Sequence, residues 1–147
     1  MQRTWGSVFE RDRQNHSALM CAALDGRTKN VKALLARGAN VNAKDGEGRT
    51  ALMFAVINMH YETMKVLLDW GADVNVKAND GGTALMLAAS CGDPRIVQAL
   101  LNSGADLNGN FVTTGKSAVM LAAEKGYTAV VELLKRTVTR QQPGQPW

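Results

Sequence analysis

The sequence predicts an all-α solenoid of four helix-turn-helix units joined by hairpin-like loops. Three observations predict it: a repeat of 33 or 34 residues, a hydroxyl residue before an apolar helix in each unit, and a glycine-bounded loop between units. Small-residue pairs mark the repeat, at Ala22-Ala23, Ala55-Val56, Ala88-Ala89 and Ala122-Ala123. One helix pair cannot bury its apolar face alone, so the units must stack on one another.

Each unit opens on a helix-start motif: Ser-Ala-Leu-Met at 17–20, Thr-Ala-Leu-Met at 50–53 and 83–86, and Ser-Ala-Val-Met at 117–120. The Ser or Thr hydroxyl is expected to cap the first helix by accepting a hydrogen bond from a backbone N–H. Pro94 suits the first turn of a second helix, where a missing N–H costs nothing. Gly38, Gly71 and Gly104 are expected to end the second helices in a left-handed conformation.

Two positions depart from the repeat. Met59 stands where the other units have Gly26, Gly92 and Gly126, and we expect the turn to differ there rather than to strain Met59. The loop of the fourth unit has one extra residue, which puts Phe111 at or near its tip.

The loops carry the most specific motif: Gly-Ala-Asn-Val-Asn at 38–42, Gly-Ala-Asp-Val-Asn at 71–75 and Gly-Ala-Asp-Leu-Asn at 104–108. With the helix-start motifs, it makes the chain resemble the ankyrin-repeat family over about residues 8–135. The resemblance implies L-shaped units and protein binding through hairpin tips and the concave face of the inner helices. Each unit has Ala and Met where the family usually has Pro and His. We therefore expect a packing ladder of Met20, Met53, Met86 and Met120, with a soft-metal site as the lesser alternative.

The repeat divides the chain into six segments. Residues 1–11 are an N-terminal segment with part of a repeat loop, and residues 139–147 are predicted to form a flexible tail. The repeats are assigned to 12–44, 45–77, 78–111 with the extended loop, and 112–138, which is truncated. Val8, Asp12 and Asn15 match loop positions of the next unit. Either Arg3–Gly6 and Trp5 cover the first helix pair, or the chain descends from a longer array.

The resemblance implies a non-enzymatic protein–protein interaction module, acting as a scaffold, adaptor or inhibitor. Its partner-binding residues are expected at non-repeating positions on the loop tips and the exposed ends of the first helices. They are Arg13, Gln14, His16, Leu24, Asp25, Glu47, Arg49, Ile57, Asn58, Asn79, Asp80, Ser90, Cys91, Phe111, Thr113, Lys116, Glu124 and Lys125.

Three apolar residues among these, Leu24, Ile57 and Phe111, are expected to form the dry centre of a contact. Its charged surround would be Arg13, Arg49 and Lys116. The alternative is that Leu24 and Ile57 only pack against neighbouring loops. Trp70 is expected on the opposite, convex side, as a second contact or a partly buried ring.

No catalytic constellation is visible. His16 and His60 have no Cys or carboxylate at metal-ligand spacing, so we expect no metal and no cofactor. Cys21 is expected to be a small core residue and Cys91 a more exposed one, with no disulfide between them and no Cys–His pair. Gly115-Lys116-Ser117 lacks the earlier glycine of a phosphate loop. These features predict that the chain is not an enzyme.

The charge distribution supports a second hypothesis. Residues 1–44 contain eight Lys or Arg against three carboxylates, whereas residues 45–147 contain nine against ten. A nucleic-acid or anionic-surface binder would use Arg11, Arg13, Arg27, Lys29 and Lys32. No aromatic residues are interleaved with these cations, so a protein partner is favoured. No apolar run approaches membrane-spanning length and no secretory signal is evident, so we expect a monomer in the cytoplasm.

The loop asparagines Asn42, Asn75 and Asn108 carry a further family-level possibility. In some eukaryotic ankyrin proteins the matching asparagine is hydroxylated. The favoured alternative is that these side chains brace their own loops by local hydrogen bonds.

Overall fold

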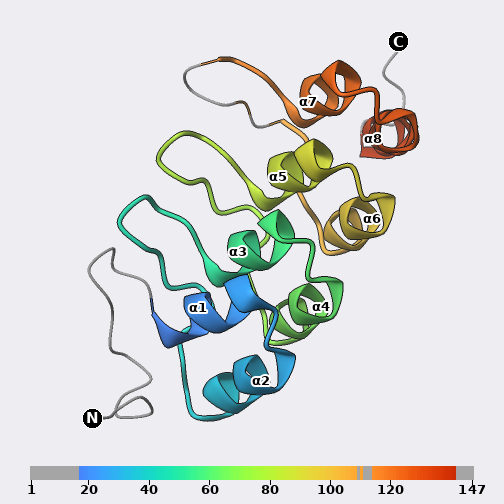
Figure 1. Ribbon diagram of the computed structural model, residues 1–147. Helices are drawn as coiled ribbons and strands as arrows, with labels where there is room; N and C mark the ends of the chain where they lie inside the picture. Colours follow the sequence, from blue (N-terminus) through green and yellow to red (C-terminus); the bar gives the residue numbers. More distant parts are fainter. Residues whose placement is uncertain (1–16, 109, 111–113, 142–147) are drawn as a thin grey trace.

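The computed structural model describes residues 17–108, 110 and 114–141, and within them the chain forms eight helices in four stacked pairs (Figure 1). The inner helices, next to the projecting loops, are α1 (Ala18–Asp25), α3 (Ala51–Ile57), α5 (Ala84–Cys91) and α7 (Ala118–Glu124). The outer helices are α2 (Thr28–Ala36), α4 (Tyr61–Asp69), α6 (Pro94–Asn102) and α8 (Thr128–Gln141). The arrangement confirms the predicted helical solenoid. None of the described helices has the length and apolar character to cross a membrane.

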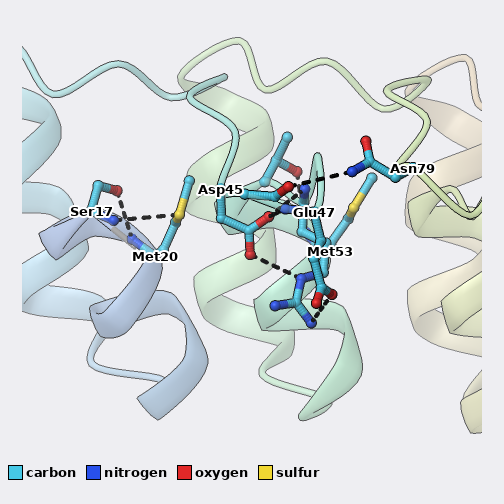
Figure 2. A network of polar contacts seen from close by, with 9 residues as sticks. Ser17, Met20, Asp45, Glu47, Met53 and Asn79 are labelled. Carbon is cyan, nitrogen blue, oxygen red and sulfur yellow. Dashed lines mark hydrogen bonds and ion pairs between the residues drawn. The ribbon is translucent and has the colours of Figure 1, made fainter. Parts of the chain in front are cut away.

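The inner helices begin where the hydroxyl residues predict. Thr50 and Thr83 adopt extended backbone conformations, and their hydroxyl oxygens accept from the N–H groups of Met53 and Met86. In the first unit Ser17 accepts from Met20 N at 3.2 Å, and the Met20 sulfur lies 3.4 Å from the Ser17 N–H (Figure 2). The side chain of Met20 thus takes the place that Glu or Gln holds in the usual reciprocal cap.

The outer helices also begin and end as their residues predict. Asp93 caps α6 by accepting from Arg95 N at 2.9 Å, and Pro94 fills the first turn. Gly71 ends α4 with φ of 88°, and the following Ala72 donates its N–H to the Leu67 carbonyl at 3.0 Å. A left-handed residue at this point satisfies carbonyls that the helix itself leaves unpaired.

The expectation of a different turn at Met59 is wrong. Met59 adopts φ of 59°, in the same left-handed region as Gly26 (70°) and Gly92 (81°). A Cβ added at Gly26 would lie 2.5 Å from the His60 ring, and one at Gly92 would lie 2.8 Å from the Tyr127 ring. His60, Asp93 and Tyr127 hold one repeat position in successive units, so the residue that would face Met59 is Asp93 of the third unit. A ringless neighbour explains why a side chain fits at position 59.

The methionine ladder is confirmed for three of its four members. Met20, Met53 and Met86 are 1–2% exposed, because the following unit covers each of them. Met120 is 54% exposed, so its assignment to the internal ladder is wrong. The described residues include no fifth unit beside α7, and the same position therefore faces outward.

Cys21 is also placed differently from the prediction. It is exposed on α1, whereas Cys91 on α5 is half-buried, which reverses the expected order. Its equivalents in the next two units are Phe54, which is buried, and Leu87, which is half-buried. Burial at this repeat position therefore differs from unit to unit. The apolar character of Cys21 alone could not predict whether its side chain is buried.

Candidate interaction surface

The tip of the second hairpin is organised by a buried carboxylate (Figure 2). The Asp45 side chain is only 1% exposed, and its Oδ1 accepts from the N–H groups of Glu47 (2.9 Å) and Arg49 (2.8 Å). Its Oδ2 accepts from Arg49 Nε at 2.9 Å, and the Asp45 N–H donates to the Arg49 carbonyl. One side chain therefore sets the turn and also orients the guanidinium of Arg49.

The protonation of Asp45 follows from this geometry. Burial is the largest single influence on the pKa of Asp45 and would raise it. The hydrogen bonds from the Arg49 and Glu47 backbone, with the hydrogen bond and positive charge of the Arg49 side chain, together outweigh burial and lower this pKa below its ordinary value. Asp45 therefore stays ionised at neutral pH and holds Arg49 by a charge-assisted contact.

Neighbouring tips are tied to each other. The Asn79 N–H donates to the Glu47 carbonyl at 2.9 Å, and Asn79 Nδ2 donates to the Gly46 carbonyl at 3.3 Å (Figure 2). Asp80 Oδ1 accepts from Gly82 N and shapes the third tip. The two tips enclose a hollow of about 190 Å³ lined by Glu47, Arg49, Ala78, Asn79 and Asp80. These residues form a firm, charged edge of the array.

A second set of contacts joins the ends of the inner helices. Asn58 Nδ2 donates to the Leu24 carbonyl at 2.8 Å, and Cys91 Sγ–H donates to the Ile57 carbonyl at 3.7 Å. Lys125 Nζ donates to the Ser90 carbonyl at 3.2 Å. All three donors occupy one repeat position, and each satisfies a carbonyl of the preceding unit. These expected partner-binding residues thus also join the units, a role that sequence reasoning missed.

The side chains of Leu24 and Ile57, whose carbonyls accept two of these bonds, are exposed to solvent. Leu24 on α1 and Ile57 on α3 are 37% and 38% exposed, and they hold the same repeat position in adjacent inner helices. Ser90 and Glu124 occupy that position in the last two units and are polar. The apolar part of this face therefore covers the first two units, with a polar continuation over the third and fourth.

Two residues of the predicted charged surround, Arg49 and Lys116, are already engaged within the molecule. The Arg49 guanidinium lies 5.0 Å from the centre of the Phe54 ring, and Arg49 Nη1 lies 3.4 Å from Glu47 Oε2. Lys116 Nζ lies 2.7 Å from Glu124 Oε2. Such exposed pairs contribute little to stability, but they fix where each charge is presented. Asp25 similarly lies 3.8 Å from Arg27.

The five remaining members of the expected site lie outside the described residues: Arg13, Gln14, His16, Phe111 and Thr113. Arg11 and the N-terminal segment lie outside them too. The tail predicted for residues 139–147 begins inside α8, which extends to Gln141, and residues 142–147 lie outside the described residues. The structure therefore brings Leu24, Ile57 and their neighbours together on one face without placing Phe111. Lys29 and Lys32 of the alternative basic site lie exposed on α2, on the outer side of the array.

The described residues contain no group of three or more His, Cys, Asp or Glu side chains that could hold a metal ion.

The Cys91 thiol is not activated as a nucleophile. Its burial is the largest influence on its pKa and raises it, the charge of Asp93 raises it further, and the charge of Lys125 acts in the opposite direction. A raised pKa leaves the thiol protonated and a poor nucleophile. The His60 ring Nε2 lies 3.0 Å from the Leu24 carbonyl, in the same junction as Asn58.

Two of the loop asparagines, Asn42 and Asn75, brace the next unit. Asn42 Oδ1 accepts from Asp73 N at 2.8 Å, and Asn75 Oδ1 accepts from Asp106 N at 2.7 Å. The expectation of local bonds is therefore wrong for Asn42 and Asn75, because the partner lies 31 residues away in each case. The structure leaves the modification of these asparagines untested.

Comparison with known proteins identifies the repeat independently. A family model described as ankyrin repeats (three copies) matches residues 6–78 and 71–142, which together include nearly the whole chain. No curated protein matches the chain. Repeats of this kind are generally protein–protein interaction modules and are typically non-enzymatic.

Proposed function

The chain belongs to the ankyrin-repeat family, and on this premise we propose that it is a non-enzymatic scaffold, adaptor or inhibitor that binds a partner protein on its inner face. The inner face comprises the exposed ends of α1, α3, α5 and α7 and the hairpin tips. The observation that carries the proposal is the exposure of Leu24 and Ile57 at one repeat position, between firmly held polar groups. Apolar groups surrounded by polar ones are typical of the centre of an interface.

The frame around this apolar pair supports the proposal. The junction contacts of Asn58 and Cys91 hold the carbonyls behind Leu24 and Ile57, and Asp45 holds Arg49. A partner would therefore meet a surface that is already ordered, so less conformational entropy is lost on binding. We place the partner across the first two inner helices, with the tips carrying Glu47 and Asn79 as one edge of the contact.

Position-specific cross-linking tests the proposed face. A photo-cross-linking amino acid at Ile57 should capture the partner from a lysate of the source cells, and one at Lys32 on the outer helix α2 should not. Both positions are exposed, so the pair controls for accessibility. Capture from Lys32 with none from Ile57 would show that the partner uses the other side of the array.

The nucleic-acid alternative has a separate test. Binding through Lys29, Lys32 and Arg27 would weaken steeply as salt increases, because counterions are released from the phosphates. Duplex DNA and RNA titrated against the chain at about 50 mM salt should show no binding if the partner is a protein. Salt-sensitive binding that is lost in a Lys29→Gln, Lys32→Gln variant would support the alternative.

A further inference from the structure

Charge is separated between the two helical layers. The sequences of the four outer helices contain seven Lys or Arg and three carboxylates, whereas those of the inner helices contain two carboxylates and no Lys or Arg. The outer layer is therefore the positively charged side of the solenoid, although the N-terminal third of the sequence carries most of the net charge. A surface of one sign favours partners of the opposite sign.

A groove of about 500 Å³ lies within this outer layer, between α6 and α8 and reaching the start of α4. The outer helices α4 and α6 approach each other less closely than α2 and α4 or α6 and α8. Among the described residues that line the groove, the charged ones are Arg95 from α6 and Arg136 from α8, and none is a carboxylate. Ala99, Ala129 and Leu133 make part of its floor apolar.

The polar groups of the groove are positioned to accept a ligand. The Arg95 guanidinium lies 4.9 Å from the centre of the Tyr61 ring, and both residues line the groove. Asp93 engages one Arg95 nitrogen at 3.4 Å, yet the Arg95 side chain is 70% exposed. Gln98 Nε2 donates to Asn102 Oδ1 at 2.9 Å. The Asn102 oxygen is thus engaged, and its Nδ2 group is the part of the amide that can donate to a ligand.

We propose that this groove binds an acidic segment of a partner protein, with carboxylates at Arg95 and Arg136 and an apolar side chain on Leu133. Two cations that line one groove with a partly apolar floor suit a peptide that alternates carboxylates with apolar side chains. A nucleic acid fits less well, because strong duplex binding uses roughly 6–10 phosphate contacts and Glu62 and Asp69 interrupt the basic surface on α4. The groove lies on the opposite side from the inner face, so both can be occupied together.

The proposal is tested with the ¹⁵N-labelled chain and the capped peptide Glu-Leu-Glu-Leu-Glu, at about 50 mM salt to limit screening. Backbone amides of α6 and the side-chain amides of Gln98 and Asn102 should shift on titration. The matched peptide with Gln in place of Glu should cause no shift. Arg95→Gln and Arg136→Gln should each weaken binding by about threefold to tenfold, as loss of a charge-assisted contact predicts.

Lys32→Gln serves as the control, since Lys32 is exposed on α2 and does not line the groove. It should leave the peptide affinity unchanged, and all three variants should otherwise keep the native amide spectrum. Shifts confined to the inner face, or equal binding of the Gln peptide, would overturn the proposal. Tighter binding of a 12-base-pair duplex DNA through Arg95 and Arg136, at a length of about one helical turn, would assign the groove to nucleic acid instead.

Discussion

Met86 and Met120 hold the same position in neighbouring units, and their local structure is the same. Each follows a Ser or Thr cap, and each donates its N–H to that hydroxyl, at 3.3 and 3.4 Å. Met86 is 2% exposed, whereas Met120 is 54% exposed. The helix start is therefore a property of the local sequence, and burial is a property of the next unit. The middle of the array and its last unit differ in stacking rather than in local fold.

The largest expected effect tests this difference directly. Met86→Ala should lower the free energy of unfolding by about 2–4 kcal/mol, because a buried side chain is lost between two units. Met120→Ala should lower it by less than about 0.5 kcal/mol, as is usual for exposed sites. Urea unfolding followed by circular dichroism measures both. Equal losses would mean that stacking does not account for the burial of Met86.

Gly92 and Gly126 provide a second pair, because both are left-handed, with φ of 81° and 76°. An added Cβ would lie 2.8 Å from the Tyr127 ring at Gly92, whereas at Gly126 it would meet no atom of the described residues within 4 Å. Gly126→Ala should cost about 1 kcal/mol for backbone strain, and Gly92→Ala about 2–3 kcal/mol for strain and overlap. Combining each change with Tyr127→Ala should remove the excess at Gly92 only. An excess that persists without the ring would disprove the overlap.

The third comparison is between a buried hairpin carboxylate, Asp45, and an exposed one, Asp80. Asp45→Asn should cost about 1–2 kcal/mol at neutral pH, because the charge-assisted bonds to Arg49 and Glu47 are lost. Asp80→Asn should cost less, because Asp80 is exposed and its Oδ1 accepts a hydrogen bond from the neutral Gly82 N–H. Thermal melts at neutral pH rank the two variants.

The same pair has a distinct pH dependence. The pKa of Asp45 is lowered in the folded state, so its stabilisation is present above the ordinary carboxyl pKa near 4 and is lost as pH falls through the folded pKa. The loss of stability below about pH 4 should therefore be shallower in Asp45→Asn than in the parent chain. An unchanged acid profile would show that Asp45 gains nothing from ionisation in the folded state.

The smallest expected effect is an increase in the free energy of unfolding. Met59 is a non-glycine residue with φ of 59° and is 48% exposed, so glycine would relieve strain and lose little burial. Met59→Gly should stabilise the chain by about 0.5–1 kcal/mol after the greater freedom of glycine in the unfolded chain is counted. A shift in the urea midpoint measures it. A destabilised variant would mean that Met59 packs favourably in the second junction.

Local chemistry was predictable from the sequence, and the contacts between units were not. The Ser and Thr caps, the left-handed glycines and Pro94 follow from single residues and their neighbours, and the structure confirms them. The junction donors Asn58, Cys91 and Lys125 differ in chemistry, so no motif marks their shared role. The exposure of Cys21 and Met120 and the outer groove depend on which units and helices lie alongside, which spacing alone does not specify.

The central claim is that Leu24 and Ile57 serve binding while the repeat positions serve stability. A Leu24→Ser, Ile57→Ser variant should keep its free energy of unfolding within about 1 kcal/mol of the parent, since both side chains are more than a third exposed. Its capture of the partner, through a photo-cross-linker placed at Ser90, should fall at least about tenfold, the effect expected for hot-spot residues. Trp70→Ser, exposed at the end of α4, should leave capture unchanged. Undiminished capture by a stably folded Leu24→Ser, Ile57→Ser variant would contradict the account.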